Sequence, residues 1–136
     1  MDIYATILDA TGTKNPSNHV IDGVSLIPQL QGKNNPDRPD HFLCHFPHSH
    51  RSSYFTTYRK GDWKLIYRYK TKIGNRTLPP YELYDLASDS YEKINLAEQK
   101  PNKLKTMIKQ MMAQLDEEGA QYALDSSKEE LRPVLP

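Results

Sequence analysis

Four short runs rich in strand-forming residues occupy the middle of this 136-residue chain and limit what it can form. Alternation of apolar and polar residues with a period of two is typical of strands that have one buried face. The first run covers residues 41–46 and ends at Pro47. Because proline lacks the N–H group that a central strand donates, Pro47 predicts a strand end or a sheet edge.

The second and third runs predict a β-hairpin. They cover residues 54–58 and 63–69, and Gly61 in the turn between them can adopt a positive φ angle. The fourth run, residues 81–86, follows a polar loop. Together the runs predict a small antiparallel sheet of about four strands.

One long helix is predicted over residues 101–118. Pro101 suits its first position and Gly119 its end. Lysines lie near its start and acidic residues near its end, which opposes the helix dipole. We therefore expect packing on the sheet, rather than intrinsic helicity, to stabilise it. The apolar residues at helical spacing are Leu104, Met107, Ile108, Met111 and Leu115.

Two short helices are predicted before the strands. The first covers residues 2–11, with Asp2 as its N-cap, and the second lies within 25–32, with Ser25 as its N-cap. Neither is long enough to be stable alone. The fold class predicted is α+β, with the small antiparallel sheet packed against the C-terminal helix.

The remaining segments are predicted to form turns and loops. Asp89 and Glu92 have the spacing of a capping box, which predicts a tight helical turn. Residues 126–136 are predicted to form a loosely ordered tail.

Charge and cysteine content exclude several classes of protein. Lys and Arg number 18 and Asp and Glu 17, a formal net charge of +1, which excludes a polycation that wraps nucleic acid. No apolar run approaches the ~20 residues that span a bilayer. We therefore expect neither nucleic acid nor a membrane as partner. The single cysteine, Cys44, excludes an internal disulfide and is predicted to be a buried structural thiol.

Four of the five histidines lie within ten residues, which leaves three interpretations open. Imidazole is a common ligand of transition metals, but the spacing matches no established metal motif, so no metal site is predicted. The side chains can also be ordinary surface histidines. They can instead line a cleft for an anionic substrate, because imidazole donates to sulfate, carboxylate or sugar oxygens. The four are His41, His45, His48 and His50.

The predicted hairpin is basic and the segment after it is acidic. Residues 56–79 carry seven cations against one anion, a net charge of +6, and residues 80–98 carry five acids against one base, a net charge of −4. The hairpin can present a solvated face, a surface for a polyanionic substrate, or a surface for nucleic acid, since aromatic residues interleave with the cations.

Six segments, taken in order, resemble one family, the formylglycine-dependent sulfatases of the alkaline-phosphatase-like superfamily. The resemblance covers nearly the whole chain, and the ordered set is more specific than any one segment. The matching segments are residues 2–12, 22–32, HFPH at 45–48, RKGDWKLI at 59–66, ELYDL at 82–86, and Asp89, Glu92 and NLA at 95–97.

The resemblance implies a C-terminal subdomain that docks on a large α/β domain and helps to shape the substrate cleft. It implies that residues 1–36 are the terminal segment of that large domain, with the two short helices left over from it. Residues 37–124 are then the C-terminal subdomain, and residues 125–136 a tail.

The catalytic pattern of the family is absent from this sequence. The family makes its formylglycine from Cys or Ser in a Cys/Ser-x-Pro-x-Arg motif and binds calcium through Asp and Asn. Here Cys44 is followed by His45, Phe46 and Pro47, and no Ser begins the motif. We therefore expect no catalytic residue, metal or cofactor in this chain, with calcium and formylglycine only in a missing N-terminal domain.

The resemblance also implies two substrate contacts. His45 and His48 match a segment that reaches the sugar-binding side of the cleft in some relatives. The neighbouring residues His50, Arg51, Arg59 and Lys60 carry no such implication from the family.

The function expected is that of a C-terminal fragment of a periplasmic or secreted sulfatase that acts on sulfated carbohydrate. The fragment alone is expected to be inactive, and its partner is the missing catalytic domain. Exposed apolar helices would also favour self-association, through Ile3, Ile7, Leu8, Leu26, Ile27 and Leu30.

Two alternatives stay open at the level of sequence. One is a stand-alone module that binds anions or glycans through the basic hairpin and the histidines. The other is a hairpin domain that binds RNA or single-stranded DNA, against which the near-zero net charge argues.

Overall fold

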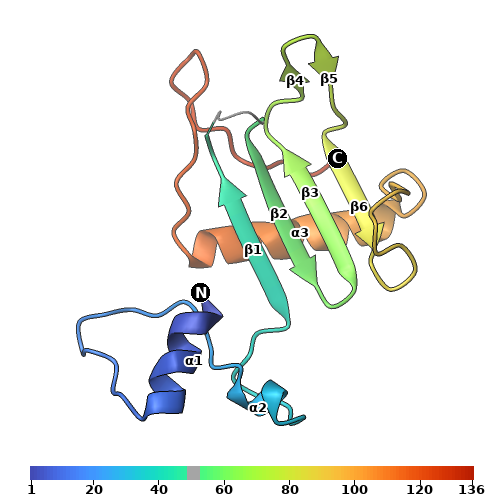
Figure 1. Cartoon of the computed structure of the whole chain (residues 1–136). Helices are drawn as coiled ribbons and strands as arrows, with labels where there is room; N and C mark the ends of the chain where they lie inside the picture. The colour runs from blue at the N-terminus through green and yellow to red at the C-terminus, as the bar shows by residue number, and fades with distance from the viewer. Residues whose placement is uncertain (49–52) are drawn as a thin grey trace. The chain divides into compact units, whose positions relative to one another are not determined.

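The computed structural model describes residues 1–48 and 53–136, which form two compact units, Met1–Pro39 and Asp40–Pro136 (Figure 1). Each unit is described by itself below. Of the residues singled out in the sequence, His50 and Arg51 lie outside the described ranges. No helix in the described ranges combines the length and apolar character needed to cross a membrane.

The N-terminal unit contains helices α1 (Asp2–Thr11) and α2 (Ile27–Leu30). Gly12 ends α1 as predicted, with a φ of 64° and its N–H group donating to the Asp9 carbonyl. Gly23 lies so close to the start of the chain that an added Cβ would be 2.5 Å from the carbonyl carbon of Met1.

Both N-cap assignments in this unit are wrong by one position or more. Asp2 is the first residue of α1 itself, and its carboxylate instead accepts the N–H group of Val24 and pairs with Arg38 at 2.8 Å. The contact with Arg38 is the main cause that lowers the pKa of Asp2 below its usual value, and the N–H group of Val24 is the second. Ser25 lies two residues before α2, where its Oγ accepts the N–H group of Ile27 at 3.2 Å. Tertiary partners thus replace local capping at Asp2, whereas Ser25 still bonds the first N–H group of α2 from outside the N-cap position.

The helices of this unit bury none of their side chains. Ile3, Ile7 and Leu30 have exposed fractions of 70%, 55% and 78%. The other three residues predicted to mediate self-association are half-buried, namely Leu8, Leu26 and Ile27. Self-association itself stays a prediction.

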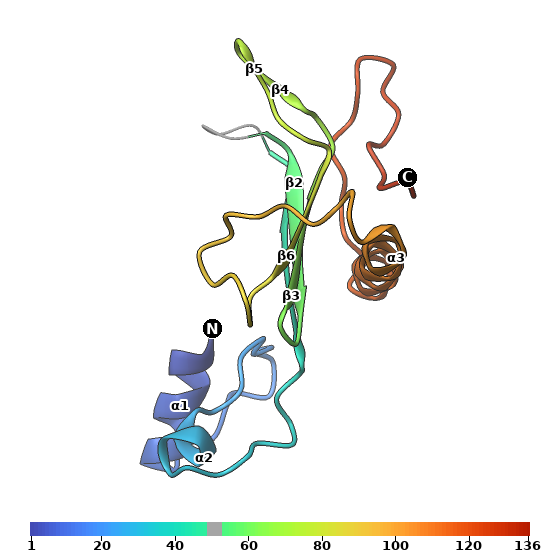
Figure 2. The ribbon, with the colours of Figure 1, turned by 90° about the vertical axis from the view of Figure 1, so that its right-hand side faces the viewer.

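The second unit is a four-stranded antiparallel sheet with one helix on one face, so the predicted α+β class is confirmed (Figures 1 and 2). The strand order is β1-β2-β3-β6, which makes β1 an edge strand, in agreement with Pro47 at its end. The elements are β1 (His41–Phe46), β2 (Phe55–Lys60), β3 (Trp63–Arg68), β6 (Tyr81–Asp85) and α3 (Pro101–Glu117).

The core lies between α3 and the sheet. All five apolar residues predicted to form the helix stripe are buried, and four of them are fully inaccessible. They pack on side chains that alternate along the strands, because every second residue of a strand points to the same face. The sheet contributes Tyr58, Leu65, Tyr67 and Leu83, with Leu43, Trp63, Tyr69 and Tyr81 at the margin.

Two turns differ in how well the sequence predicted them. Gly61 lies in the β2–β3 turn with a φ of 56°, as expected. The polar loop after β3 contains a small hairpin that the sequence did not predict, formed by β4 (Lys72–Ile73) and β5 (Arg76–Thr77). Two-residue strands are too short to show alternation, so no pattern marked them.

The capping box proposed for Asp89 and Glu92 is wrong. A tight turn does form, since the N–H group of Glu92 donates to the Asp89 carbonyl at 3.2 Å, but the two side chains do not cap it. Residues 86–95 lie on the side of the sheet away from α3 (Figure 2). The carboxylate of Asp89 accepts the N–H group of Ile94 at 2.8 Å. Glu92 has a positive φ of 56° and points its carboxylate at Lys64.

The tail is more ordered than predicted. The carboxylate of Asp125 accepts two backbone N–H groups, those of Ser127 and Glu129, and so forms a tight turn. Further along, the N–H group of Val134 donates to the Tyr67 hydroxyl at 2.9 Å. These contacts attach the tail to the sheet.

Truncating the centre of the helix stripe should destabilise the second unit. Met111→Ala removes a fully buried side chain, and we expect it to lower the free energy of unfolding by about 2–5 kcal/mol. Chemical denaturation followed by circular dichroism measures the loss. The exposed neighbour Lys109 provides the control, since Lys109→Ala should change stability by less than about 0.5 kcal/mol. Equal effects of the two substitutions would contradict this account of the core.

Candidate functional site

One end of the sheet brings together the two predicted substrate contacts, His45 and His48, and the β4–β5 hairpin. Phe46, Phe55 and Arg68 are paired in register, so β1 ends, β2 begins and β3 ends at the same end of the sheet (Figure 1). His48 follows β1 at this end, and the β4–β5 hairpin continues from β3 there.

His45 lies on β1 with both ring nitrogens in hydrogen bonds. Its Nε2 lies 2.8 Å from the carbonyl oxygen of Gln121, which can only accept, so Nε2 carries a proton. Its Nδ1 lies 2.7 Å from Oγ1 of Thr56, and the same Oγ1 lies 2.7 Å from the Tyr69 hydroxyl. In a neutral imidazole Nδ1 accepts, so Thr56 donates to His45 and Tyr69 donates to Thr56. A continuous chain of donors therefore joins Tyr69 to Gln121.

Aromatic rings surround this hydrogen-bond chain. The rings of Tyr69 and Tyr122 lie edge-on to the imidazole of His45, with centroids 5.9 and 5.3 Å away. Burial raises the pKa of the Tyr69 hydroxyl well above its usual value. Tyr69 is therefore protonated and able to donate at any physiological pH.

The location of His45 bears on its predicted contact with substrate. The ring points to the α3 side of the sheet, and both of its nitrogens already have partners within the chain. A contact between this imidazole and a sugar would have to exchange one of those hydrogen bonds. In the structure His45 joins β1 to the segment after α3, and its contact with substrate stays a prediction.

His48 differs from His45 in its exposure. It lies just beyond β1 and is exposed, with its ring edge-on to Phe46 at a centroid distance of 5.4 Å. Among residues 1–48 and 53–136, no group is hydrogen-bonded to its ring nitrogens. No described residue would therefore have to be displaced before a ligand could bond with this imidazole.

The histidine cluster does not form a metal site in the part of the chain that the structure describes. His41 and His48 lie at opposite ends of β1, and Nδ1 of His41 is 3.4 Å from the Asp40 carboxylate. Over residues 1–48 and 53–136, no three His, Cys, Asp or Glu side chains come together as metal ligands. The described residues therefore offer no cluster of carboxylates that fits a calcium ion.

Cys44 is less buried than predicted. It is half-buried, on the sheet face opposite α3, because residues of β1 alternate between the two faces and Leu43 and His45 point to the helix. It lies outside the core beneath α3, so its predicted burial is wrong in degree.

Two of the seven cations of the basic hairpin are neutralised by acidic residues that come later in the sequence. Nζ of Lys64 lies 2.7 Å from both carboxylate oxygens of Glu92, and Arg68 lies 2.9 Å from Glu82. The Arg68 guanidinium also donates to a backbone carbonyl at 3.1 Å. The basic and acidic segments of the sequence thus meet in space, which favours a solvated, internally paired face for this hairpin.

Two further cations of the hairpin, Arg59 and Lys60, lie at the turn between β2 and β3. Nε of Arg59 donates to the carbonyl of Gly61 at 3.0 Å. Nζ of Lys60 lies 3.8 Å from the carboxylate of Asp40, and both side chains are largely exposed. Exposed pairs of this kind contribute little free energy, but they reduce the attraction of this turn for an external anion.

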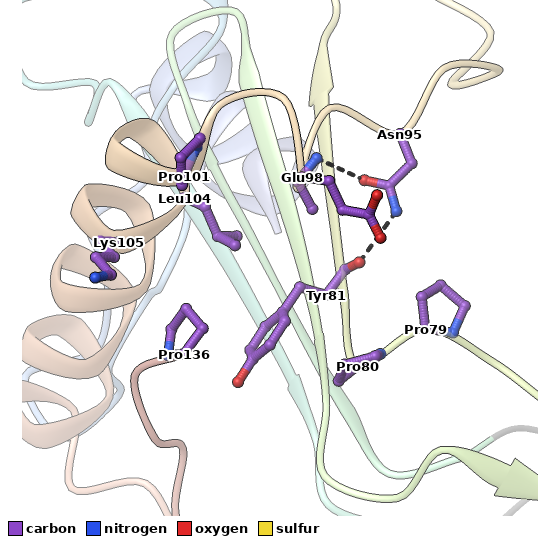
Figure 3. A pocket seen from close by; sticks show the side chains of 10 residues that line it. Pro79, Pro80, Tyr81, Asn95, Glu98, Pro101, Leu104, Lys105 and Pro136 are labelled. Carbon is purple, nitrogen blue, oxygen red and sulfur yellow. Dashed lines mark hydrogen bonds between the residues drawn. The ribbon is translucent and has the colours of Figure 1, made fainter.

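A pocket of about 400 Å³ lies between the start of β6 and the start of α3 (Figure 3). Tyr81 and several prolines make it mostly apolar. Asn95 uses its side chain on backbone groups, since its Oδ1 accepts from Ala97 and its Nδ2 donates to the Tyr81 carbonyl. The charged groups at its edge are Glu98 and Lys105. The polar side chain at its wall thus serves the fold, and no ligand is assigned to this pocket.

Comparison with known proteins identifies the family. Residues 1–121 match the family model described as N-sulphoglucosamine sulphohydrolase, C-terminal. The chain belongs to this family. The resemblance inferred from the ordered motifs is therefore confirmed as a sulfatase C-terminal domain.

Individual relatives agree with this assignment. Arylsulfatase K of Xenopus laevis is 29% identical over 123 residues, which cover 85% of this chain and 22% of that protein. BT4656, solved in complex with its substrate D-glucosamine-2-N,6-O-disulfate, is 26% identical with a TM-score of 0.61, covering 85% of this chain and 23% of that one. The chain thus spans about a quarter or less of the length of these relatives.

A further solved structure supports the fold alone. The putative sulfatase yidJ from Bacteroides fragilis is 19% identical, with a TM-score of 0.62 over 88% of this chain and 25% of that one.

Sequence reasoning missed three residues of the sulfatase C-terminal domain that act on His45. Thr56 had a usable signal, because it is a polar residue at an inward-facing position of an alternating run, and buried polar groups require partners. Gln121 contributes its backbone carbonyl, which no side-chain pattern reveals. Tyr122 follows it in the segment after α3, where no periodicity exists.

The hydroxyl of Thr56 should be required for the stability of this site. Thr56→Val keeps the shape of the side chain but leaves Nδ1 of His45 and the Tyr69 hydroxyl without their shared partner. We expect a loss of about 1–3 kcal/mol in the free energy of unfolding, measured by chemical denaturation.

The neighbouring threonine supplies a matched control. Thr57→Val makes the same exchange on the opposite face of β2, where the hydroxyl makes no hydrogen bond to any described residue. Its effect should stay within about 0.5 kcal/mol. A loss in this control as large as in Thr56→Val would remove the support for the hydrogen-bond chain.

Proposed function

We propose that this chain is the C-terminal part of a longer sulfatase, a sulfuric ester hydrolase that acts on sulfated carbohydrate. The observation that carries the proposal is the family match over residues 1–121, together with the fold it shares with sulfatases. The substrate class is supported by the relative solved with a sulfated glucosamine, which is 26% identical to this chain.

The catalytic groups of this enzyme belong, in this proposal, to the remainder of the longer protein. That part supplies the formylglycine and the calcium ion, and it is the partner of the domain described here. The proposal places the whole enzyme in the periplasm or outside the cell, as the resemblance to sulfatases implies. Self-association through the exposed residues of α1 and α2 is a further part of it.

The proposed role of this domain is to shape the cleft in which the sulfated sugar binds. His48 is the contact that the geometry favours, because its imidazole is exposed and makes no hydrogen bond to the described residues. His45 is proposed to act mainly through position, since its two hydrogen bonds fix β1 and hence the start of the segment that carries His48, two residues beyond Phe46.

The chain alone should not hydrolyse a sulfate ester. Purified residues 1–136 are expected to give no turnover of an aryl sulfate, with or without added calcium. The sequence has no motif from which formylglycine could be made, and the described residues have no cluster that could bind calcium. A continuous spectrophotometric assay measures this directly. Turnover that disappears on Cys44→Ala would contradict the proposal.

The longer protein encoded by the gene provides a positive control. The longer reading frame, if it continues upstream into a Cys- or Ser-x-Pro-x-Arg motif, should give an active enzyme when expressed whole. An upstream sequence without that motif would count against the proposal as strongly as activity of the short chain.

The contact assigned to His48 can be tested in the active, longer enzyme. His48→Ala should raise KM for a sulfated oligosaccharide by about tenfold, the effect of losing one hydrogen bond to a charged group. The kcat for a small aryl sulfate, which lacks the sugar that His48 is proposed to contact, should not change. His48→Asn, which keeps a donor, should recover part of the loss. An unchanged KM would remove His48 from the substrate site.

A further inference from the structure

The seven cations of the basic hairpin fall into two groups. Those between positions 59 and 68 interact with carboxylates or backbone carbonyls, as described above. The other three, Lys70, Lys72 and Arg76, are exposed and make no ion pair with any residue the structure describes. Residues 49–52 contain no Asp or Glu, so they have no carboxylate side chain that could pair with these cations.

These three cations lie on or beside the β4–β5 hairpin, residues 70–78, which we call the basic arm. Lys72 pairs in register with Thr77, and Ile73 pairs with Arg76. Because paired residues point to the same face, Lys72 and Arg76 point to opposite faces of the arm. Its base is held by the N–H group of Leu78, which donates to the carbonyl of Thr71 at 2.8 Å.

The sequence around the arm keeps its charge uncompensated. No Asp or Glu occurs between Asp62 and Glu82, and both neighbouring carboxylates of the sheet face, Glu82 and Glu92, are already paired. The arm therefore carries a local charge of +3 at the same edge of the sheet as His48. A positive charge presented on two faces suits a chain of several anions better than a single small ion.

We propose that the basic arm binds a sulfated or carboxylated glycan chain. The inference rests on the proposed function, and it extends that function to a second group of contacts with the same class of ligand. The arm carries hydroxyl and amide groups on Thr71, Asn75 and Thr77, which can bond with sugar hydroxyls.

The residues of the arm favour a glycan over single-stranded nucleic acid. Proteins that bind single strands stack the bases on exposed aromatic side chains. The arm has no aromatic residue between positions 70 and 78. The nearby ring of Tyr54 is covered by the ammonium of Lys70, 4.7 Å from its centroid. Nucleic acid therefore serves as a competing outcome of the test.

The test measures binding of a heparin-derived octasaccharide to the purified chain, residues 1–136. The variant Lys70→Gln/Lys72→Gln/Arg76→Gln removes three charges from the arm. We expect it to raise the dissociation constant about tenfold at low salt, which is the combined effect of losing three exposed charge contacts. Binding of the unchanged chain should weaken steeply as salt rises.

A matched control removes the same charge elsewhere. Lys100→Gln/Lys105→Gln/Lys109→Gln takes three exposed lysines from the start and outer face of α3. It should leave the dissociation constant within about twofold at the same salt concentration, because these lysines lie on α3 and not on the arm that is proposed to contact the glycan. Thermal unfolding of both variants verifies that each is folded.

Three outcomes would overturn the inference. They are no binding by the unchanged chain, equal weakening in the two variants, and equally tight, equally arm-dependent binding of a single-stranded oligonucleotide. None of these affects hydrolysis of a small aryl sulfate by the longer enzyme. Failure of the arm is therefore distinguishable from failure of the proposed function, which would appear as an inactive longer enzyme.

Discussion

Packing of the α3 stripe on the sheet is the interaction on which the rest of this domain depends. The charges of α3 oppose its own dipole, and a four-stranded sheet with an uncovered apolar face is not stable in water, so neither element has an independent source of stability. Each becomes stable by burying the other. Met107, Met111, Leu65 and Leu83 lie fully inaccessible at that contact. Everything placed at the strand ends is held in position by this buried layer.

The polar chain through His45 extends the same layer to the edge of the sheet. An edge strand has a neighbour on one side only, so β1 is the strand most easily displaced. Thr56 and the Gln121 carbonyl hold the His45 side chain from two directions and attach β1 to the segment after α3. The cost of burying polar groups is offset because each donor in the chain has an acceptor. The position of His48 is thereby linked to the helix core.

The sequence predicted the elements whose signal is periodic. Alternation marked the long strands and their faces, and helical spacing marked all five buried residues of α3. It failed where a side chain has a tertiary partner in place of a local one, as at Asp2 and Glu92. The site was less predictable than the fold. The ring of His45 bonds to a residue 76 positions away, and Lys64 pairs with Glu92, 28 positions away, distances at which no local pattern operates.

The left-handed backbone of Glu92 has a consequence for the turns that cover the open face of the sheet. A residue with a side chain adopts this conformation reluctantly, and glycine would adopt it without strain. Glycine would also delete the carboxylate that attaches the segment to Lys64. Relief of backbone strain and retention of the ion pair with Lys64 thus require different residues at position 92. An engineered chain with glycine at this position would have a less strained turn, but it would lose the ion pair that attaches these turns to the sheet.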